Sequence, residues 1–355
     1  MDYDIVIIGG GPAGASFARL LPNHFKVLII EKSSKTSTLG KVCGGLLAPD
    51  AQSELKKQGI ILPEEILVEP NLNHVLAYDT HQNMKRYYPR HYVNVNQSKF
   101  DDYLISLLRQ NVDISYESKF KSYLEQDGFV SVNYVKNSAT HTIRTKYMVS
   151  AEGASSLVRR QLTNGYDSIK KYVCIQEWFH TDLEMSYYLA HFSINITDYY
   201  SWVIPKNYTI IIGSALEVGS EAKRKFSSLK KEIISVNANL ERPIRKESHF
   251  LFRPRRMKDF VLGTNRIFLI GEAAGFVSPS SGEGISYALK SARKLARAFD
   301  YSYSRISTIY RKMVRMMAIY LLMKNVKSFI IYTPFLRRMI MKIGITSVSP
   351  SKIKK

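Results

Sequence analysis

The chain has 355 residues, which at about 100–200 residues per domain is enough for two or three domains. Its hydrophobic content of 45% and charged content of 23% exclude a disordered or collagen-like protein. Two cysteines, Cys43 and Cys174, are too few for a disulfide framework or a four-thiolate zinc site. Neither H-E-x-x-H nor C-x-x-C spacing occurs, so the sequence predicts no metal site.

Basic residues outnumber acidic ones and gather near the end of the sequence. Lys and Arg total 51 against 30 Asp and Glu, a net charge of +21. Residues 301–355 hold twelve Lys and Arg and no acidic residue. Such segregation favours an anionic partner, such as an acidic membrane surface or a phosphorylated substrate, over charge that serves solubility alone. No nucleic-acid recognition fold is apparent, so nucleic acid is not the expected partner.

The start of the sequence bears on localisation. The first apolar run, residues 5–8, follows Asp2 and Asp4 without a basic leader or a cleavage site. No stretch reaches the roughly 18–20 apolar residues that a membrane-spanning helix needs. We therefore expect a cytoplasmic protein, or one bound peripherally to the inner face of the membrane.

Strands and helices alternate in the first part of the sequence. Residues 4–8 predict a buried parallel strand, residues 12–21 a helix and residues 26–30 a second strand, a βαβ unit of about thirty residues. A helix is expected over 100–108 and a strand over 147–151.

The middle of the sequence has a different texture. Short β-branched and aromatic runs indicate an antiparallel sheet, over residues 173–179, 187–196, 201–204 and 209–213. A helix over 226–240, a buried strand over 266–270 and a helix over 284–300 follow.

The first strand runs into a G-x-G-x-x-G turn, composed of Gly9, Gly10, Gly11, Pro12, Ala13 and Gly14. Gly9 allows a tight turn, Gly11 the close approach of a pyrophosphate, and Gly14 the packing of helix on strand. Phosphates then rest at the helix N-terminus. Glu31 lies 22 residues after Gly9, at the end of the second strand beside Lys32, where a carboxylate accepts hydrogen bonds from ribose hydroxyls. The pattern predicts a dinucleotide site.

Downstream, residues 267–275 form a predicted strand and a turn containing Glu272, and Gly284 and Ile285 open a helix. At this point the sequence resembles flavoproteins of the p-hydroxybenzoate-hydroxylase fold. The resemblance implies FAD, with Glu272 at the ribityl chain and the helix N-terminus at the flavin pyrimidine. A helix N-terminus there stabilises the negative charge of reduced flavin by about 0.3–2 kcal/mol. Residues 151–159 resemble the second fingerprint of this fold, with Glu152 in place of the usual Asp.

Two further segments narrow the family. Residues 41–47 resemble the K-x-C-G-G segment of geranylgeranyl reductases, which lies by the flavin; the matching residues are Lys41, Cys43, Gly44 and Gly45. Residues 200–205 resemble the Y-x-W-x-F-P substrate motif of these enzymes; Tyr200, Trp202 and Pro205 match, and Ile204 replaces Phe. Longer strings over 43–52, and over 271–276 followed by 283–289, are similar to the bacterial CbrA branch, and the similarity extends from the first strand to about residue 340.

One departure concerns the cofactor. Gln97 stands where the family usually places an Arg that helps to hold the FAD pyrophosphate. An amide donates hydrogen bonds but carries no charge, so we expect weaker FAD binding unless Lys41 or Lys99 compensates.

These observations predict an α/β fold with a discontinuous Rossmann-type FAD-binding domain, an inserted antiparallel β-sheet substrate domain and a C-terminal helical segment. The expected FAD-binding domain comprises residues 1–72, 97–165 and 262–300, and the substrate domain residues 73–96 and 166–261. Residues 301–355 form the basic helical segment.

The resemblance implies an FAD-dependent oxidoreductase that reduces carbon–carbon double bonds of an isoprenoid or lipid-like substrate at the membrane surface. Cys43 is the candidate catalytic residue, as a gate or a proton relay; the alternative is a small buried hydrophobic residue. No second G-x-G-x-x-G occurs, so NAD(P)H docks transiently or a protein donor reduces the flavin. Two other functions stay open. One is a monooxygenase or halogenase, because residues 202–205 also resemble the halogenase W-x-W-x-I-P string; the other is a lipid-binding flavoprotein without turnover.

The basic tail has an apolar pattern as well. Lys and Arg alternate with apolar positions that predict a membrane-interface helix, namely Met313, Val314, Met316, Met317, Tyr320, Leu321 and Met323. In the alternative interpretation this apolar face packs on the FAD-binding domain.

Overall fold

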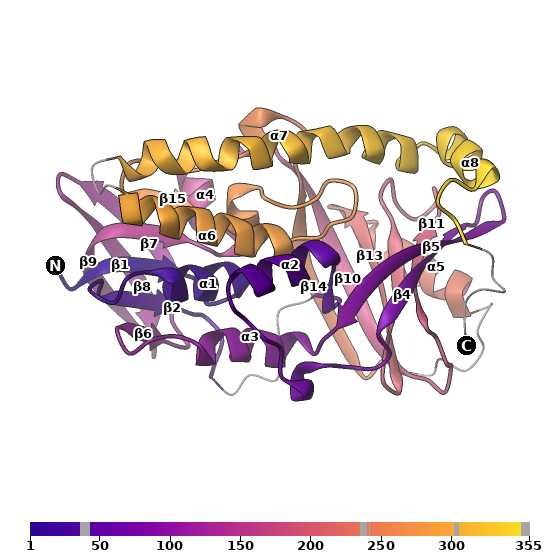
Figure 1. Ribbon diagram of the computed structural model, residues 1–355, viewed down its shortest axis with the longest axis horizontal. Helices are drawn as coiled ribbons and strands as arrows, with labels where there is room; N and C mark the ends of the chain where they lie inside the picture. Colours follow the sequence, from indigo (N-terminus) through magenta and orange to yellow (C-terminus); the bar gives the residue numbers. More distant parts are fainter. Residues whose placement is uncertain (36–42, 235–239, 241, 302–304, 349–355) are drawn as a thin grey trace. The chain divides into compact units, whose positions relative to one another are not determined.

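The computed structural model describes residues 1–35, 43–234, 240, 242–301 and 305–348. These residues form two compact units, which we describe separately (Figure 1). The first comprises Met1–Lys41, Ser98–Lys170 and Phe252–Lys324, and the second Val42–Gln97, Lys171–Leu251 and Asn325–Lys355. Both units are discontinuous in sequence.

A parallel sheet forms the centre of the first unit. Strand β1 (Tyr3–Ile8) pairs in parallel with β2 (Val27–Ile30) and β9 (Ala139–Ser150). Further parallel pairs join β2 to β6 (Val112–Ser115) and β9 to β15 (Ile267–Leu269). The β-branched residues of β1 and β2 are fully buried because both faces of a parallel sheet are covered. The first half of β9 pairs antiparallel with β8 (Phe129–Lys136), which pairs with β7 (Lys119–Gln126).

Helices cover this sheet. Helix α1 (Pro12–Leu20) packs against α6 (Ile285–Tyr301), with the Phe17 and Phe299 rings 5.7 Å apart at their centroids. Helix α7 (Ile306–Tyr332) begins in this unit and is fixed to the sheet by the buried Tyr310 hydroxyl, which donates to the Leu269 carbonyl at 2.8 Å. The first unit also contains α4 (Leu157–Leu162) and all of α3 (Gln97–Ser106) except its first residue.

The second unit is built on an eight-stranded sheet in the order β14-β10-β13-β12-β11-β4-β5-β3. Its strands are β3 (Leu46–Leu47), β4 (Leu72–Asp79), β5 (Met84–Asn94), β10 (Lys170–His180), β11 (Tyr187–Phe192), β12 (Ser201–Lys206), β13 (Thr209–Glu217) and β14 (Arg245–Arg253). Strand β4 pairs antiparallel with β5. The pairs β10–β13, β13–β12 and β12–β11 are also antiparallel, whereas β11 runs parallel to β4. The unit also contains α2 (Pro49–Lys57) and α5 (Ala222–Ile234), and the buried face of α5 packs in its core.

The α/β class and the two-sheet architecture confirm the expected fold. The predicted strand over 147–151 is the end of the twelve-residue β9, because its polar first half pairs with a neighbouring strand instead of entering the core. Residues 43–72, placed by the sequence analysis in the FAD-binding domain, contain β3, which pairs with β5 of the second sheet. The predicted domain boundaries stay a prediction.

Helix α7, which contains the apolar pattern of the basic C-terminal segment, has two apolar faces rather than one. Within the predicted set, Val314, Met317 and Leu321 are buried, whereas Met316, Tyr320 and Met323 are exposed. One set therefore packs on the first unit and the other faces outward. Within the residues that the structure describes, no helix combines the length and apolar character that a bilayer crossing requires.

Candidate functional site

The G-x-G-x-x-G turn connects β1 to α1 in the first unit. Gly9 has a φ of +100°, and a Cβ there would lie 2.7 Å from the Ala151 carbonyl oxygen at the end of β9. A Cβ at Gly14 would overlap the Gly9 carbonyl, so α1 can begin directly over the strand end only with glycine at this position. Gly11 precedes Pro12 at the start of α1, and no side chain in the described part of the chain caps the helix. The free amides of its first turn are therefore open to an anion.

Glu31 lies next to this turn. Its buried carboxylate accepts a hydrogen bond from the Gly10 amide at 2.6 Å and from the Ser33 amide at 3.0 Å. The end of β2 and the glycine turn are thus joined through one side chain, whereas Lys32 points to solvent and is exposed.

Glu272 lies in the 3-10 helix η4 (Gly271–Ala274), which follows β15. Its Oε1 accepts from the Phe252 amide at 2.8 Å, and burial raises its pKa to about 7. Near neutral pH this carboxyl can therefore donate as well as accept hydrogen bonds. At the start of α6, apart from the two residues next to Gly284 in the chain, no atom of the described residues lies within 4 Å of the place of a Cβ on Gly284. The nearby Ser286 hydroxyl is buried and has no hydrogen-bond partner among the described residues.

These features suit FAD. The uncapped start of α1 fits a pyrophosphate, the Glu31 carboxylate fits a ribose, and the Glu272 carboxyl fits the hydroxyls of a ribityl chain. The space beside Gly284 and the unpartnered Ser286 hydroxyl at the start of α6 are suited to a flavin edge that accepts hydrogen bonds. Sequence analysis did not single out Ser286, because a serine in the first turn of a helix is ordinary.

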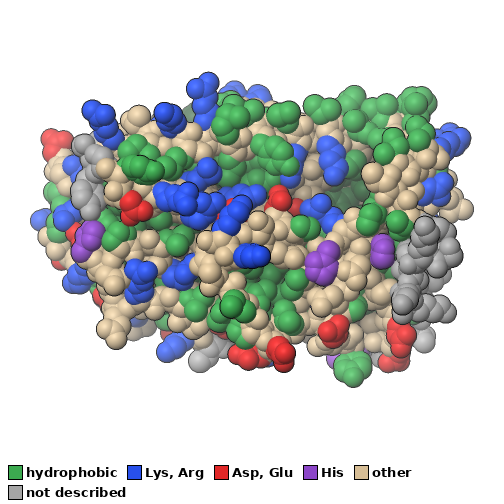
Figure 2. All heavy atoms as spheres, viewed as in Figure 1, with side chains coloured by type: hydrophobic (Ala, Val, Ile, Leu, Met, Phe, Trp, Pro, Cys, Tyr) green, Lys and Arg blue, Asp and Glu red, His purple; other side chains and the backbone are tan. Residues whose placement is uncertain are grey.

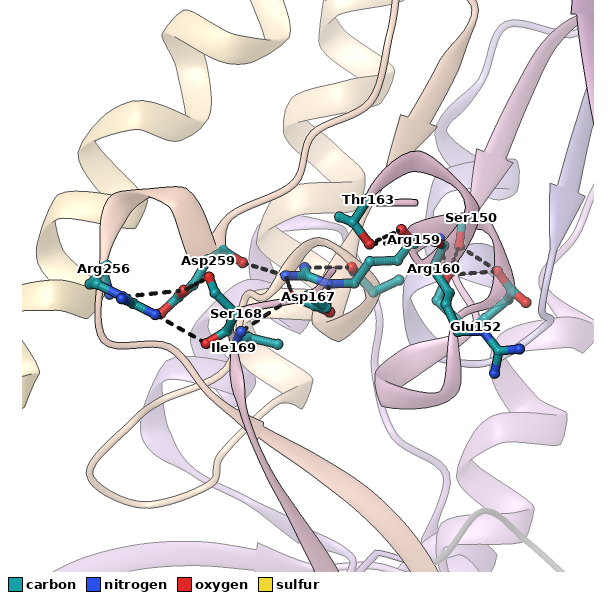
Figure 3. Close-up of polar contacts among 12 residues, drawn as sticks. Ser150, Glu152, Arg159, Arg160, Thr163, Asp167, Ser168, Ile169, Arg256 and Asp259 are labelled. Atoms are coloured by element: carbon teal, nitrogen blue, oxygen red, sulfur yellow. Dashed lines mark hydrogen bonds and ion pairs between the residues drawn. The ribbon is translucent and has the colours of Figure 1, made fainter. Parts of the chain in front are cut away.

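The second fingerprint folds into a polar network in the first unit (Figure 3). The Glu152 carboxylate accepts from the Ser150 and Ser156 hydroxyls at 2.8 and 2.7 Å. It also accepts from the amides of Leu157 and Val158, at the N-terminus of α4, where a negative charge is favourable. Glu152 thus anchors α4 to the end of β9.

Arg159 is the centre of the same network and is only 1% exposed. Its guanidinium donates to both carboxylate oxygens of Asp167, at 2.6 and 2.9 Å. It also donates to the Ala273 carbonyl at 3.1 Å and to the Asp259 carbonyl at 2.8 Å. Because Ala273 belongs to the 3-10 helix that carries Glu272, Arg159 supports the backbone beneath that carboxyl.

The K-x-C-G-G segment has its described part in the second unit, and Lys41 lies outside the described residues. Cys43 is half-buried. A Cβ on Gly44 would lie 2.5 Å from the Ile204 Cδ1 atom. Gly45 has a φ of +60°, and a Cβ there would overlap the Val95 carbonyl and lie 2.6 Å from the Lys206 Nζ atom. The segment therefore lies directly against β12.

Strand β12 carries the Y-x-W-x-I-P string, so the two segments that resemble geranylgeranyl reductases meet in the second unit. The Trp202 ring lies over Gly213, where a Cβ would overlap it. Tyr200 lies next to Trp202, with ring centroids 5.7 Å apart, and burial raises its pKa well above the usual value. The Pro205 carbonyl accepts from the buried Asn94 amide group at 2.9 Å.

Lys206, at the end of β12, was missed by the sequence analysis. Its Nζ atom is buried and donates to the Val95 carbonyl at 2.6 Å and to the Gly45 carbonyl at 3.2 Å. The sequence does contain a sign of this site, because a charged residue, Lys206, directly follows the apolar run that ends with Pro205.

The structure therefore places the predicted site residues in two groups. The glycine turn, Glu31, Glu272, Gly284 and Ile285 belong to the first unit. The second unit contains Cys43, Gly44, Gly45, Tyr200, Trp202, Pro205 and Gln97, which begins α3. Their roles toward FAD and substrate stay predictions.

Comparison with known proteins identifies an FAD binding domain and relatives over nearly the whole chain. Residues 2–304 match the family model described as FAD binding domain. The CbrA protein of Escherichia coli O6:H1 is 36% identical over 352 residues, which cover 99% of this chain and 96% of that protein. CbrA of Escherichia coli K12 is 35% identical and is covered over 99% of both chains.

Two solved structures show the same fold. A geranylgeranyl bacteriochlorophyll reductase-like protein from Thermoplasma acidophilum has a TM-score of 0.83 at 19% identity, over 98% of this chain and 94% of that one. CmlS, a flavin-dependent halogenase, has a TM-score of 0.71 at 19% identity, over 90% of this chain and 63% of that one.

We predict that Arg159→Met destabilises the protein by about 3 kcal/mol, because a partly buried carboxylate and two carbonyls lose the guanidinium that donates to them. Thermal and urea unfolding measure the change in the free energy of unfolding. Arg160→Met is the matched control, because the neighbouring Arg160 is exposed; a change within about 0.5 kcal/mol is expected there. Equal losses in both variants would contradict the assigned role.

We predict that Gly45→Ala is more destabilising than Gly59→Ala. Both glycines have a positive φ, +60° and +67°, but Gly59 has open space where a Cβ would stand. The control variant therefore measures backbone strain alone, about 1–2 kcal/mol, and the excess at Gly45 measures overlap with the Val95 carbonyl, about 1–3 kcal/mol more. Urea unfolding midpoints give both values, and identical midpoints would show that the turn is not tightly packed.

Proposed function

We propose that this chain, which belongs to the CbrA family of FAD-dependent oxidoreductases, reduces carbon–carbon double bonds of an isoprenoid or lipid-like substrate at a membrane surface. The observation that supports it most is the contact between the Cys43-Gly44-Gly45 turn and β12. These are the two segments that resemble the flavin-side and substrate-side motifs of geranylgeranyl reductases.

The aromatic surface around β12 suits an isoprenoid chain. Tyr200 packs against Trp202, Tyr199 and Tyr332, with ring centroids 5.7, 5.0 and 6.4 Å apart. Aromatic side chains give a large apolar area with little loss of conformational freedom. The same unit offers the polar Tyr200 hydroxyl, and burial raises its pKa well above the usual value, so it acts as a neutral hydroxyl.

FAD, when bound, supplies the hydride that an alkene carbon accepts. The chain's own residues bind the cofactor, exclude water and hold the proton for the second carbon. An unactivated alkene needs orientation in a water-poor site, which Trp202 and Pro205 on the fully buried strand β12 favour. The electron donor is NAD(P)H docked transiently or a redox protein.

Product analysis tests this function. We expect purified flavoprotein, reduced with dithionite or NADPH, to convert polyprenyl phosphates or polyprenyl lipids to products two mass units heavier per reduced bond, with oxidation of the flavin. Tyr200→Phe is the conservative comparison, because it keeps the ring and removes the hydroxyl. Stopped-flow oxidation of the reduced protein is the second measurement. A C4a-hydroperoxide signal with oxygenated or halogenated product would favour the monooxygenase or halogenase alternative, and ligand binding without turnover would favour a lipid-binding flavoprotein.

The exposed side chains of helix α8 (Pro334–Ile343) support the proposed location at a membrane surface. Its charged Arg337 points inward, where it pairs with the fully buried Asp79 at 2.6 Å. Its apolar Phe335 and Ile343 point outward and are 68% and 67% exposed, as is Met339 in part. Met341 packs inward beside Arg337, so α8 has apolar side chains on its outer face as well as on its buried one. A helix on a protein surface usually keeps its apolar side chains toward the core.

Cationic side chains accompany this apolar face. Figure 2 shows hydrophobic side chains with Lys and Arg among them along the edge that α7 and α8 form. Arg338 and Lys342 of α8 are exposed, and residues 301–355 contain no acid. Exposed apolar and cationic groups together are typical of a segment that lies in the interface of an anionic bilayer.

We predict that Phe335→Ser/Met339→Ser/Ile343→Ser reduces sedimentation of the protein with vesicles of phosphatidylcholine and phosphatidylglycerol at least about tenfold, since each buried side chain contributes about 1.5–3 kcal/mol. Arg337 and its pair with Asp79 stay in place, so α8 keeps its attachment. Ile61→Ser is the control, because Ile61 is 82% exposed and lies in the same unit but outside α8. Unchanged binding of the triple variant would contradict the membrane role of α8.

A further inference from the structure

Lys206 is a cation within a strand whose six residues are all buried. It is 5% exposed, and no carboxylate pairs with it among the residues that the structure describes. A lysine in such a place requires an explanation, because burial of an unpaired ammonium is costly.

Two backbone carbonyls hold the ammonium. Nζ donates to Val95 at 2.6 Å and to Gly45 at 3.2 Å, so it links the Cys43-Gly44-Gly45 turn to the end of β5. An ammonium has three N–H groups and a neutral amine has two. Both carbonyls can therefore keep their donors after Lys206 has lost one proton.

Cys43 is the nearby group that can accept this proton when it is a thiolate. It lies two residues before Gly45, whose carbonyl accepts from Lys206 Nζ, and a thiolate at Cys43 favours the charged form of Lys206. The neighbouring side chains on β5 and β12, Asn94 and Pro205, carry no charge. Burial lowers the pKa of Lys206 to about 7, so the extra proton is held weakly near neutral pH.

We propose that Lys206 is a positioning residue that serves as the proton store for Cys43. The inference rests on the proposed reduction of an alkene and deepens it. The Cys43 S–H bond breaks and gives its proton to the alkene carbon that does not take up hydride. The thiolate then accepts a proton from the Lys206 ammonium, which becomes an amine still bonded to both carbonyls, and water restores the ammonium. The two electrons come from the reduced flavin, so the sum is one hydride and one proton per double bond.

The first test follows alkylation of Cys43 by iodoacetamide against pH in the full-length flavoprotein, with mass spectrometry of the Cys43 peptide and no alkene present. Lys206→Gln keeps two N–H donors for the carbonyls but removes the charge. We expect its alkylation midpoint to lie above that of the unmodified protein, because the thiolate loses the ammonium that is present up to about pH 7. Cys174, 1% exposed, reports folding by staying unmodified.

The second test separates charge from proton supply. Lys206→Arg keeps the cation, but a guanidinium does not release its proton in this pH range. We expect the alkylation midpoint to stay low. Steady-state alkene reduction with excess dithionite becomes at least about tenfold slower and loses its decline above pH 7, because Cys43 must regain a proton before each further turnover. Superimposed alkylation profiles for the Gln variant, or an unchanged rate and pH profile for the Arg variant, would overturn the proposal. An absence of alkene reduction in the unmodified protein, with the alkylation shift present, would instead refute the proposed function.

Discussion

Close approach of backbones at glycine is the constraint on which both motif turns depend. Gly14 lies against the Gly9 carbonyl in the first unit, and Gly45 lies against the Val95 carbonyl in the second. In each case the neighbouring atom belongs to a peptide group held by a strand or turn, so it cannot give way to a Cβ as a flexible side chain can. The helix start at α1 and the attachment of the Cys43 turn to the end of β5 both follow from this.

Two buried cations illustrate how surroundings decide a role. The planar guanidinium of Arg159 donates to a carboxylate and to two carbonyls. The carboxylate compensates its charge, and the three acceptors satisfy its N–H groups. Lys206 meets two carbonyls and no carboxylate. The first arrangement stabilises a fixed structure around η4, whereas the second leaves a proton that can be lost without breaking the contacts. Desolvation accounts for the difference, because it disfavours a charge that nothing opposite compensates.

The hydrophobic pattern of α7 and α8 does not reveal which of their side chains pack on the protein and which are exposed. Apolar residues surround α7, so it has no single apolar face; Val314 and Leu321 pack inward while Met316 and Met323 stay exposed. On α8 the charged Arg337 faces inward toward Asp79. An outward apolar surface is therefore a consequence of how each helix is attached.

Local patterns were sufficient for much of this protein. The βαβ unit, the glycine turn, the strand before Glu272 and the two-sheet architecture follow from short apolar runs and glycines, because neighbouring residues decide strand, helix and turn. The long β9, strands β4 to β8 and the parallel pairing of β11 with β4 did not follow, since pairing partners lie far apart in the sequence. Only the tertiary structure brought Gly44 and Gly45 against β12, buried Lys206 beside the Cys43 turn and turned Arg337 inward. The sequence thus determined which chemical groups are present and the cofactor family they belong to. The fold decided their neighbours, and with them the charge, pKa and exposure of each group, because these depend on contacts between distant segments.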